Sequence, residues 1–349
     1  MVKADAYGLG AVPVVRTLEA AGCDHFFVAQ LSEALEIKPA LEPSAKIFVL
    51  NGLQHGMEAD CVSAKVIPVI NSPEQASDWL DLARKLGRPL PAAIQIDSGM
   101  ARFGLSSKDV DALVGGQFFD FVPPALVMSH LACADDPGSQ NNDDQAVRFA
   151  TLANRLPAAP RSIANSAGVF LGSGFHGDLA RLGICLYGAA PVSGLTNPMA
   201  PVVRLDASVI QVRDIEPGQG VGYGLTYVAN SPRRIATIGV GYGDGWPRAL
   251  SNAGAAYYEG VCLPIVGRVS MDSMTLDVSV LDGNGLVLRA GDMVELLGPH
   301  QSLEDVAQAA GTIPYEILTR LGRRYQRTYI KGAAREHGLA WPADTMIAS

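Results

Sequence analysis

The stretch VIPVINSPEQASDWLDLARKLGRPLPAAIQID (residues 66–97) decides how the first half of the chain folds. It begins with a short apolar run, residues 66–70, and ends with another, residues 92–97. The segment between them, residues 72–87, has helical periodicity and opens with Ser-Pro-Glu, a signature of a helix N-terminus. A strand, a helix and a second strand in this order predict neighbouring parallel strands joined by a crossover helix.

The same alternation continues on both sides of this stretch. Short apolar runs occur at eight places: residues 2–7, 25–29, 47–50, 66–70, 92–97, 125–131, 161–166 and 180–187. A second helical segment, residues 141–156, begins with Asn and Asp residues suited to a helix start. Eight such units favour a closed (β/α)8 TIM-type barrel, within the α/β class, over an open sheet. In that barrel functional groups gather at the C-terminal ends of the strands.

The pattern changes after residue 187. Residues 193–201 (a stretch with Gly, Asn and two Pro) form a plausible linker, and β-rich runs follow at residues 207–215, 234–242, 261–278 and 286–297. One helix is predicted among them, at residues 302–310. We therefore expect two domains, a barrel over residues 1–198 and a mostly β domain over residues 199–349.

Composition excludes several classes of protein. The net charge of -8 comes with no basic cluster, so no nucleic-acid partner is expected. No stretch approaches the roughly 20 apolar residues of a membrane span. The five cysteines are scattered without CxxC spacing, which favours reduced thiols and a cytoplasmic location. The six histidines form no metal-ligand pattern, so we expect no metal.

Lys3 lies in the first apolar run, and composition alone would make it an exposed strand residue. The string around it, VKADAYGLG (residues 2–10), resembles the cofactor-lysine motif of alanine racemases. Eight further motifs follow in the order of that family: IDSGMARFG (96–104), SHLACADD (129–136), ANSAG (164–168), ARLGICLYG (180–188), VGYGLTY (221–227), GVGYGDGWPR (239–248), VGRVSMD (266–272) and IPYE (313–316). The resemblance implies a barrel plus a β domain, pyridoxal 5'-phosphate as cofactor, and a homodimer with sites shared across the interface.

Carried over by motif, the two catalytic bases are Lys3 and Tyr223. Lys3 would carry the cofactor and act on one face of the substrate, and Tyr223 of the second subunit would act on the other. Without the motif, Tyr223 would be read as an aromatic strand residue. A tyrosine near its reference pKa of about 10 is a poor base at neutral pH, so its surroundings must help it. The implied reaction interconverts L-alanine and D-alanine, for peptidoglycan synthesis or for alanine breakdown.

The resemblance also implies roles for the residues around the cofactor. Arg181 would face the pyridine nitrogen, and because arginine can only donate, that nitrogen would stay unprotonated. His130 would lie beside the ring and Arg181. Hydroxyl and backbone amide donors would bind the phosphate: Tyr7, Ser166, Tyr315, Gly183 and Ile184, with Asn165 adjacent. Arg102 and the backbone amide of Met271 would bind the substrate carboxylate. Tyr242, Asp272 and Tyr315 would line the entrance channel.

Two positions depart from a common pattern of the family. Gln95 stands where many members carry a carbamylated lysine, so the support of Arg102 should be weaker. Ser162 stands where histidine is frequent, which should loosen the network behind Arg181. Neither change touches the two bases.

Alternative functions share most of these motifs. One is a racemase of serine or of a broader range of amino acids, because the catalytic groups do not encode side-chain preference. Another is a non-catalytic pyridoxal-phosphate-binding protein, but such carriers lack the second domain. A third is a decarboxylase of the same architecture, which should have no arginine at the position of Arg181.

The start of the chain carries a further expectation. Only two residues precede Lys3, whereas family members have some tens of residues there. We expect that the natural chain begins earlier and that the first barrel strand is incomplete here. The barrel seam should then be open, with Lys3 on a frayed terminus.

Overall fold

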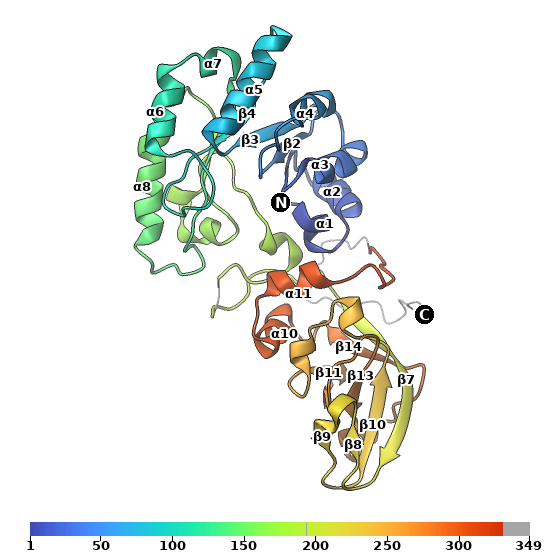
Figure 1. Ribbon diagram of the computed structural model, residues 1–349. Coiled ribbons are helices and arrows are strands. Elements are labelled where there is room, and N and C mark those ends of the chain that lie inside the picture. The colour runs from blue at the N-terminus through green and yellow to red at the C-terminus, as the bar shows by residue number, and fades with distance from the viewer. Residues whose placement is uncertain (193, 331–349) are drawn as a thin grey trace. The chain divides into compact units, whose positions relative to one another are not determined.

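The computed structural model describes residues 1–192 and 194–330 (Figure 1). Two units divide the chain, Met1–Ala200 and Pro201–Ser349, and each is described by itself.

Six parallel strands form the centre of the first unit, and each pairs with the next along the chain. They are β1 (His25–Val28), β2 (Lys46–Val49), β3 (Ile67–Ile70), β4 (Ala92–Gln95), β5 (Pro124–Met128) and β6 (Arg161–Ser162). All four residues of β4 are buried, as expected for a parallel strand covered on both faces. The chain order of the strands confirms the expected (β/α) alternation.

Helices surround these strands in Figure 1. They are α2 (Ala11–Ala20), α3 (Leu31–Ile37), α4 (Glu58–Ala64), α5 (Pro73–Leu86), α6 (Ser107–Gly115), α7 (Phe118–Phe121) and α8 (Asn141–Ala153). The predicted start of α5 is confirmed, because the Ser72 side chain accepts from the backbone amide of Gln75. Gly87, with φ of 62°, ends the helix in the left-handed conformation that glycine tolerates.

Two of the eight predicted strands are wrong. Residues Lys3–Tyr7 form the short helical turn α1, and Ile184–Tyr187 form a 3-10 turn, η4. Each turn ends at a glycine with positive φ, Gly8 (86°) or Gly188 (82°), a conformation that glycine adopts easily.

Backbone hydrogen bonds nevertheless close the ring through these two segments. The amide of Arg181 donates to Ala164 O (3.0 Å), beyond β6. The amino group of Met1 donates to Leu182 O (2.8 Å), and the amide of Val2 donates to Phe27 O on β1 (2.9 Å). The barrel therefore combines six strands with two irregular segments. The seam that we expected to be open is bridged, and Val2 is 1% exposed, so Lys3 follows a fixed residue and not a frayed one.

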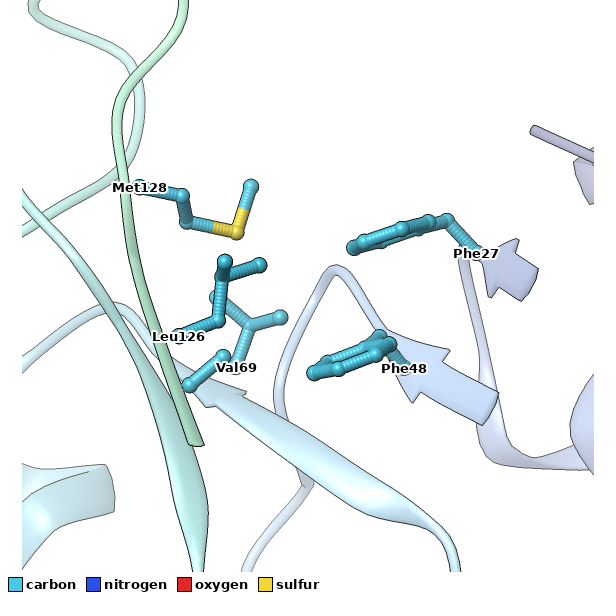
Figure 2. Close-up of a cluster of buried hydrophobic side chains, with 6 residues drawn as sticks. Phe27, Phe48, Val69, Leu126 and Met128 are labelled. Atoms are coloured by element: carbon cyan, nitrogen blue, oxygen red, sulfur yellow. The ribbon is translucent and has the colours of Figure 1, made fainter. Parts of the chain in front are cut away.

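The barrel interior is packed with apolar side chains from successive strands (Figure 2). Phe27, Phe48, Val69, Leu126 and Met128 point toward one another from β1, β2, β3 and β5, and the rings of Phe27 and Phe48 stack at 4.6 Å. Burial of each such side chain contributes roughly 1.5–3 kcal/mol. The interior is thus a core that fixes the strand ends, where the predicted site residues lie.

The second unit is mostly β, as predicted. Its main sheet has the order β12-β11-β14-β7-β10-β13, with antiparallel neighbours. The strands are β7 (Leu205–Ile215), β10 (Arg233–Ile238), β11 (Ala255–Tyr258), β12 (Val261–Pro264), β13 (Met274–Asp277) and β14 (Met293–Leu297), with the separate pair β8 (Gly220–Val221) and β9 (Tyr227–Val228). Its helices are α9 (Val280–Gly283), α10 (Leu303–Ala310) and α11 (Pro314–Arg320). Ile265, just after β12, bridges to Leu276 on β13, so the two edge strands meet.

Two properties bear on the expected environment. Within the described residues, no helix combines the length and the apolar character that crossing a membrane requires. The five cysteines, all in this part of the chain, are free thiols. Burial raises the pKa of the Cys61 thiol to about 12, so this thiol stays protonated at neutral pH.

Candidate active site

Lys3 begins a turn with an unusual backbone. The next four residues, Ala4 to Tyr7, all have φ between 52° and 56°, the left-handed helical region. Each such residue other than glycine costs roughly 1–2 kcal/mol, so other contacts must hold the turn. The amide of Ala11 donates to Asp5 Oδ1 (2.7 Å), and the amide of Ala4 donates to Glu33 Oε1 (2.6 Å). The backbone beside Lys3 is therefore fixed by two carboxylates.

Positive charge gathers around Lys3. Burial lowers the pKa of the Lys3 amine, the charge of Arg102 lowers it further, and the charge of Glu33 opposes both effects. Burial and the charges of Arg181, Arg102 and Lys3 lower the pKa of His130 to about 3. His130 is thus a neutral imidazole among three cations, an arrangement that favours an anionic ligand.

Arg181 is fixed by hydrogen bonds on several sides. It is 3% exposed, and one terminal nitrogen donates to Ser162 Oγ at 2.5 Å. The other donates to Ser129 O at 2.5 Å and lies 3.3 Å from His130 Nδ1. Burial lowers the pKa of this guanidinium from 12.5 to about 10, which leaves it protonated at neutral pH. The side chain can therefore present only donors to whatever lies before it.

We expected Ser162 to loosen the hydrogen-bond network behind Arg181, but in the structure Ser162 is bonded on two sides. Ser162 Oγ accepts from Arg181 and donates to Leu179 O at 2.5 Å. Because a hydroxyl has one donor and two acceptor sites, serine serves both neighbours here, and it is completely buried. That Gln95 weakens the support of Arg102 stays a prediction. Gln95 is buried on β4. The Arg102 guanidinium lies 5.7 Å from the centroid of the Phe103 ring.

Hydroxyl and amide groups from three segments meet beside η4. The amides of Gly183 and Cys185 donate to Ser166 Oγ, at 2.8 and 3.4 Å. The ring of Tyr7 stacks on Tyr187 at 4.6 Å. A Cβ on residue 183 would lie 2.4 Å from the Tyr7 hydroxyl oxygen, so glycine is required for this approach.

Two other predicted residues flank this group. Asn165 Oδ1 accepts from the amide of Gly168 (2.8 Å), which stabilises the turn after β6. Ile184, at the start of η4, has a side chain that is 1% exposed. The structure thus brings Tyr7, Ser166 and Gly183 together, with Asn165 and Ile184 in the adjoining turns.

The predicted site residues of the second unit lie at its surface. Tyr242 and Met271 belong to two loops that are joined, because the amide of Gly243 donates to Met271 O (2.7 Å) and that of Tyr242 to Ser270 O (2.9 Å). Asp272 pairs with Arg324 at 2.8 Å. Tyr223 begins a separate 3-10 turn, Tyr223–Leu225, and is 73% exposed.

Tyr315 lies on α11, whose C-terminal end is bound to the Tyr242 loop. The amide of Gly322 donates to Asp244 O at 2.9 Å. A Cβ on Gly245 would lie 1.7 Å from Arg320 O, so the helix end and this loop are in direct contact. Tyr242, Met271, Asp272 and the end of α11 therefore form one region of the second unit.

Sequence reasoning missed three residues that hold the site. Glu33 binds the turn after Lys3, Ser129 O accepts from Arg181, and Tyr187 stacks on Tyr7. Glu33 follows Gln30 by three positions, the spacing of a helix capping box, which was the available signal. Ser129 and Tyr187 lie inside quoted motifs, but their roles depend on tertiary contacts.

One group of metal-binding residue types does come together in the described part of the chain. His55, Glu58 and Asp78 have ligand atoms within 4.8 Å of one another. His55 Nδ1 lies 3.0 Å from Asp78 Oδ2, and the imidazole is fully exposed to solvent at its surface position. The histidine and Asp78 are thus explained as a surface ion pair.

Comparison with known proteins agrees with the motifs. Residues 1–191 match the family model of the alanine racemase N-terminal domain, and residues 202–329 match that of the C-terminal domain. The chain is 52% identical over 332 residues to the catabolic alanine racemase of Agrobacterium fabrum, covering 95% of this chain and 85% of that protein. It is 50% identical over 344 residues to the alanine racemase of Brucella suis, covering 95% and 86%.

Solved structures give the same result. The crystal structure of alanine racemase from Bartonella henselae with covalently bound pyridoxal phosphate has a TM-score of 0.91 and 44% identity, over 94% of this chain and 91% of that one. The biosynthetic alanine racemase of Pseudomonas aeruginosa has a TM-score of 0.86 and 36% identity, over 95% and 91%. The two family models together cover nearly all of the described residues, and this chain belongs to the alanine racemase family.

Proposed function

We propose that this chain interconverts L-alanine and D-alanine, with pyridoxal 5'-phosphate bound covalently at Lys3 and Tyr223 of a second subunit as the opposing base. Membership of the alanine racemase family supports the activity and the cofactor. The single observation that carries the site assignment is the position of Lys3, at the start of a fixed turn and close enough to Arg102 and His130 to interact with both electrostatically.

The residues of the first unit fit this cofactor. Its phosphate and phenolic oxygen carry negative charge, which would offset the three cations that surround the neutral His130. The phosphate needs donors in a confined space, and Tyr7, Ser166 and the amide of Gly183 provide such groups. Because Gly183 has no side chain, the Tyr7 hydroxyl can lie close to its backbone, where a Cβ would clash with it at 2.4 Å. We assign the amide of Ile184, the adjoining Asn165 and Tyr315 to the same phosphate site.

Two groups on opposite faces of the substrate move the proton. When bound, pyridoxal phosphate supplies the conjugated ring that delocalises the electron pair left on the α-carbon. Once the substrate amine has taken the place of Lys3 on the cofactor, the deprotonated Tyr223 Oη would take the α-proton of L-alanine on one face. The freed, protonated Lys3 Nζ would deliver a proton to the other face to give D-alanine. In the reverse direction Lys3 Nζ takes the proton and Tyr223 Oη returns one. Burial and the charge of Arg102 lower the pKa of Lys3, so its amine gives up a proton more readily than an exposed lysine does.

Arg181 and His130 set the electronic properties of the cofactor ring. Arg181 is protonated, buried and bonded to Ser129 and Ser162, so it can donate to the pyridine nitrogen without yielding a proton. His130 Nδ1 lies 3.3 Å from Arg181, and burial together with the nearby positive charges keeps the imidazole neutral. With Arg181 as the donor, the pyridine nitrogen of the bound cofactor would stay unprotonated and would withdraw fewer electrons, which would favour return of the proton to the α-carbon over transamination.

The substrate carboxylate is assigned to Arg102 and to the backbone amide of Met271 from the second subunit. Tyr242, Asp272 and Tyr315 would form the entrance channel. These residues, with Tyr223, are exposed in the second unit, which supports a homodimer in which they cover the site of the other chain. We assign most of the cofactor-binding residues to the barrel domain, residues 1–198, and Tyr315 and the residues of this complementary role to the β domain, residues 199–349.

The cellular role follows from the reaction. Racemisation serves D-alanine supply for peptidoglycan or alanine breakdown, and the name of the Agrobacterium relative favours breakdown. Both roles place the protein in the cytoplasm, where its free thiols stay reduced.

The experiment is a racemisation assay with a panel of L- and D-amino acids, followed by borohydride reduction and peptide mapping. We expect alanine to be the best substrate and the label to lie on Lys3. A preference for serine would replace the substrate assignment, and a label on Lys38 or Lys46 would overturn the site assignment.

A further inference from the structure

We propose that Glu33 is a positioning residue for Lys3: its carboxylate holds the left-handed turn that follows the lysine and supplies the negative charge opposite its amine. This inference rests on the proposed role of Lys3. It adds a residue that belongs to none of the motifs above.

The contacts of Glu33 join three separate segments. Glu33 lies in the first turn of α3, and its Oε2 accepts from the amides of Ala29 (2.7 Å) and Gln30 (3.0 Å), at the end of β1. Its Oε1 accepts from the amide of Ala4 (2.6 Å), which lies 29 positions away and directly follows Lys3. One carboxylate therefore connects a barrel strand, a helix start and the turn that carries the lysine.

Helix capping alone does not explain this arrangement. The chain has comparable capping boxes at Ser106–Asp109 and Ser302–Asp305. In both, the aspartate accepts from the amide and the hydroxyl of its own serine. Glu33 has one more methylene and uses its second oxygen to bind a distant residue, Ala4.

The turn that Glu33 binds requires such a contact. Ala4, Asp5, Ala6 and Tyr7 adopt positive φ without being glycine, so the turn is unfavourable on its own. Ala4 is its first residue and the only neighbour of Lys3 within it. If the Glu33 carboxylate no longer accepts from the Ala4 amide, the turn should relax toward ordinary backbone angles and move the lysine.

The charge of Glu33 acts in the same direction. Burial and Arg102 both disfavour the charged form of the Lys3 amine, and Glu33 is the group that favours it. A lysine that accepts and returns a proton must hold the charged form for part of each cycle. Glu33 thus affects both the position and the proton affinity of Lys3.

The test compares Glu33→Gln with Asp109→Asn in the pyridoxal-phosphate-loaded protein. Both substitutions replace a capping carboxylate by an amide of the same size, but only Glu33 reaches the Lys3 turn. Hydrogen exchange of the peptide covering residues 3–10 should be about tenfold faster in Glu33→Gln and unchanged in Asp109→Asn. Turnover of alanine should fall by roughly 10- to 100-fold in Glu33→Gln alone.

A second readout separates positioning from general structure. With α-deuterated substrates, the isotope effect should rise for D-alanine, whose proton Lys3 removes, and stay at the wild-type value for L-alanine. Unchanged exchange and unchanged isotope effects in Glu33→Gln would show that Glu33 is only a helix cap, and would overturn the proposal.

Glu33→Asp covers the case in which Glu33→Gln does not fold. The shorter carboxylate keeps the cap, as Asp109 and Asp305 do in their boxes, but withdraws from Ala4. It should give the same faster exchange of residues 3–10, and unchanged exchange would again contradict the proposal. The exchange result reports on the turn even if the wild-type protein racemises another amino acid, so failure of the proposed function is recognised separately.

Discussion

The predicted site residues of the two units differ in exposure: most of those in the barrel unit are buried or half-buried, with Arg102 as the exposed exception, and all of those in the second unit are exposed. In the barrel unit, Arg181 and Ser166 are each 3% exposed, and both take part in hydrogen bonds within the unit. In the second unit, Tyr223 is 73% exposed, Met271 54% and Tyr242 42%. A buried polar group needs hydrogen-bond partners inside the protein. An exposed one is solvated by water and remains accessible to a ligand or to another protein surface. The comparison shows that predicted site residues of the barrel unit are held by contacts within that unit, whereas those of the second unit project from its surface.

Exposure in the second unit does not imply a loose backbone. A Cβ on Gly241 would lie 2.4 Å from Met271 O, so the two loops are packed against each other. The Asp244 side chain accepts from the amide of Gly241 at 2.9 Å. The exposed side chains therefore project from fixed positions, as residues that meet a partner surface should.

The largest expected effect separates chemistry from cofactor binding. Tyr223→Phe should reduce racemisation by about 10²- to 10⁴-fold, because it removes a positioned acid-base group. Cofactor affinity should stay at the wild-type value, since Tyr223 is not among the residues that we propose for cofactor binding. Steady-state kinetics and absorbance titration measure the two quantities. Tyr227→Phe, which removes a hydroxyl bonded to Asp277 at 3.3 Å, is the control and should retain activity. Equal loss of cofactor and activity in Tyr223→Phe would make Tyr223 structural.

An intermediate effect tests how firmly the barrel site is built. Ser162→Ala removes the acceptor of a buried, charged guanidinium and should lower the free energy of unfolding by about 1.5–3 kcal/mol. Asp272→Asn, at an exposed ion pair of the second unit, should leave the unfolding midpoint almost unchanged. Denaturant unfolding of the loaded proteins measures both. Equal effects of the two substitutions would remove the contrast between the units.

A pH-dependent effect concerns acid stability and His130. Its pKa is about 3 in the folded protein and 6.5 as the ordinary value, so the unfolded chain binds a proton that the folded chain does not. The stability contribution is complete above about pH 6.5 and is lost as the pH falls toward 3. The slope is at most about 1.4 kcal/mol per pH unit. His130→Asn should flatten this slope at fixed free cofactor, and His55→Gln, at an exposed site, should not. A slope that is the same in His130→Asn and wild type would contradict a buried neutral imidazole.

Much of this fold could be predicted from periodicity and punctuation. Ser72, Pro73 and Gly87 delimit α5 by local rules, and the six central strands follow from alternating apolar runs. The runs at residues 2–7 and 180–187 could not be assigned correctly in this way. Their apolar composition is that of a strand, but tertiary contacts impose turns. No local propensity puts Ala4 or Tyr7 at positive φ; Glu33 and Asp5 hold that conformation from outside the turn.

The candidate site was open to prediction only through the motifs. Composition alone would make Lys3 an exposed strand residue and Tyr223 an aromatic strand residue with a solvated hydroxyl. Apart from the motifs, the residues around them give no sign of catalysis. The network behind Arg181 was misjudged for a physical reason. A serine hydroxyl donates and accepts at once, so Ser162 bonds both Arg181 and Leu179. Glu33 and Ser129 hold other site residues in place by hydrogen bonds to distant segments. Such roles become apparent only when the three-dimensional structure brings those segments together.

The most direct test of the account mixes two inactive variants, Lys3→Ala and Tyr223→Phe, under conditions that allow subunit exchange. If each site takes its lysine from one chain and its tyrosine from the other, a mixed dimer holds one site with both lesions and one with neither. Statistical exchange should then restore about a quarter of wild-type racemisation. Mass spectrometry would show whether mixed dimers form. If they form but stay inactive, both bases belong to one chain, which would contradict the claim that each site combines Lys3 of one chain with Tyr223 of the other.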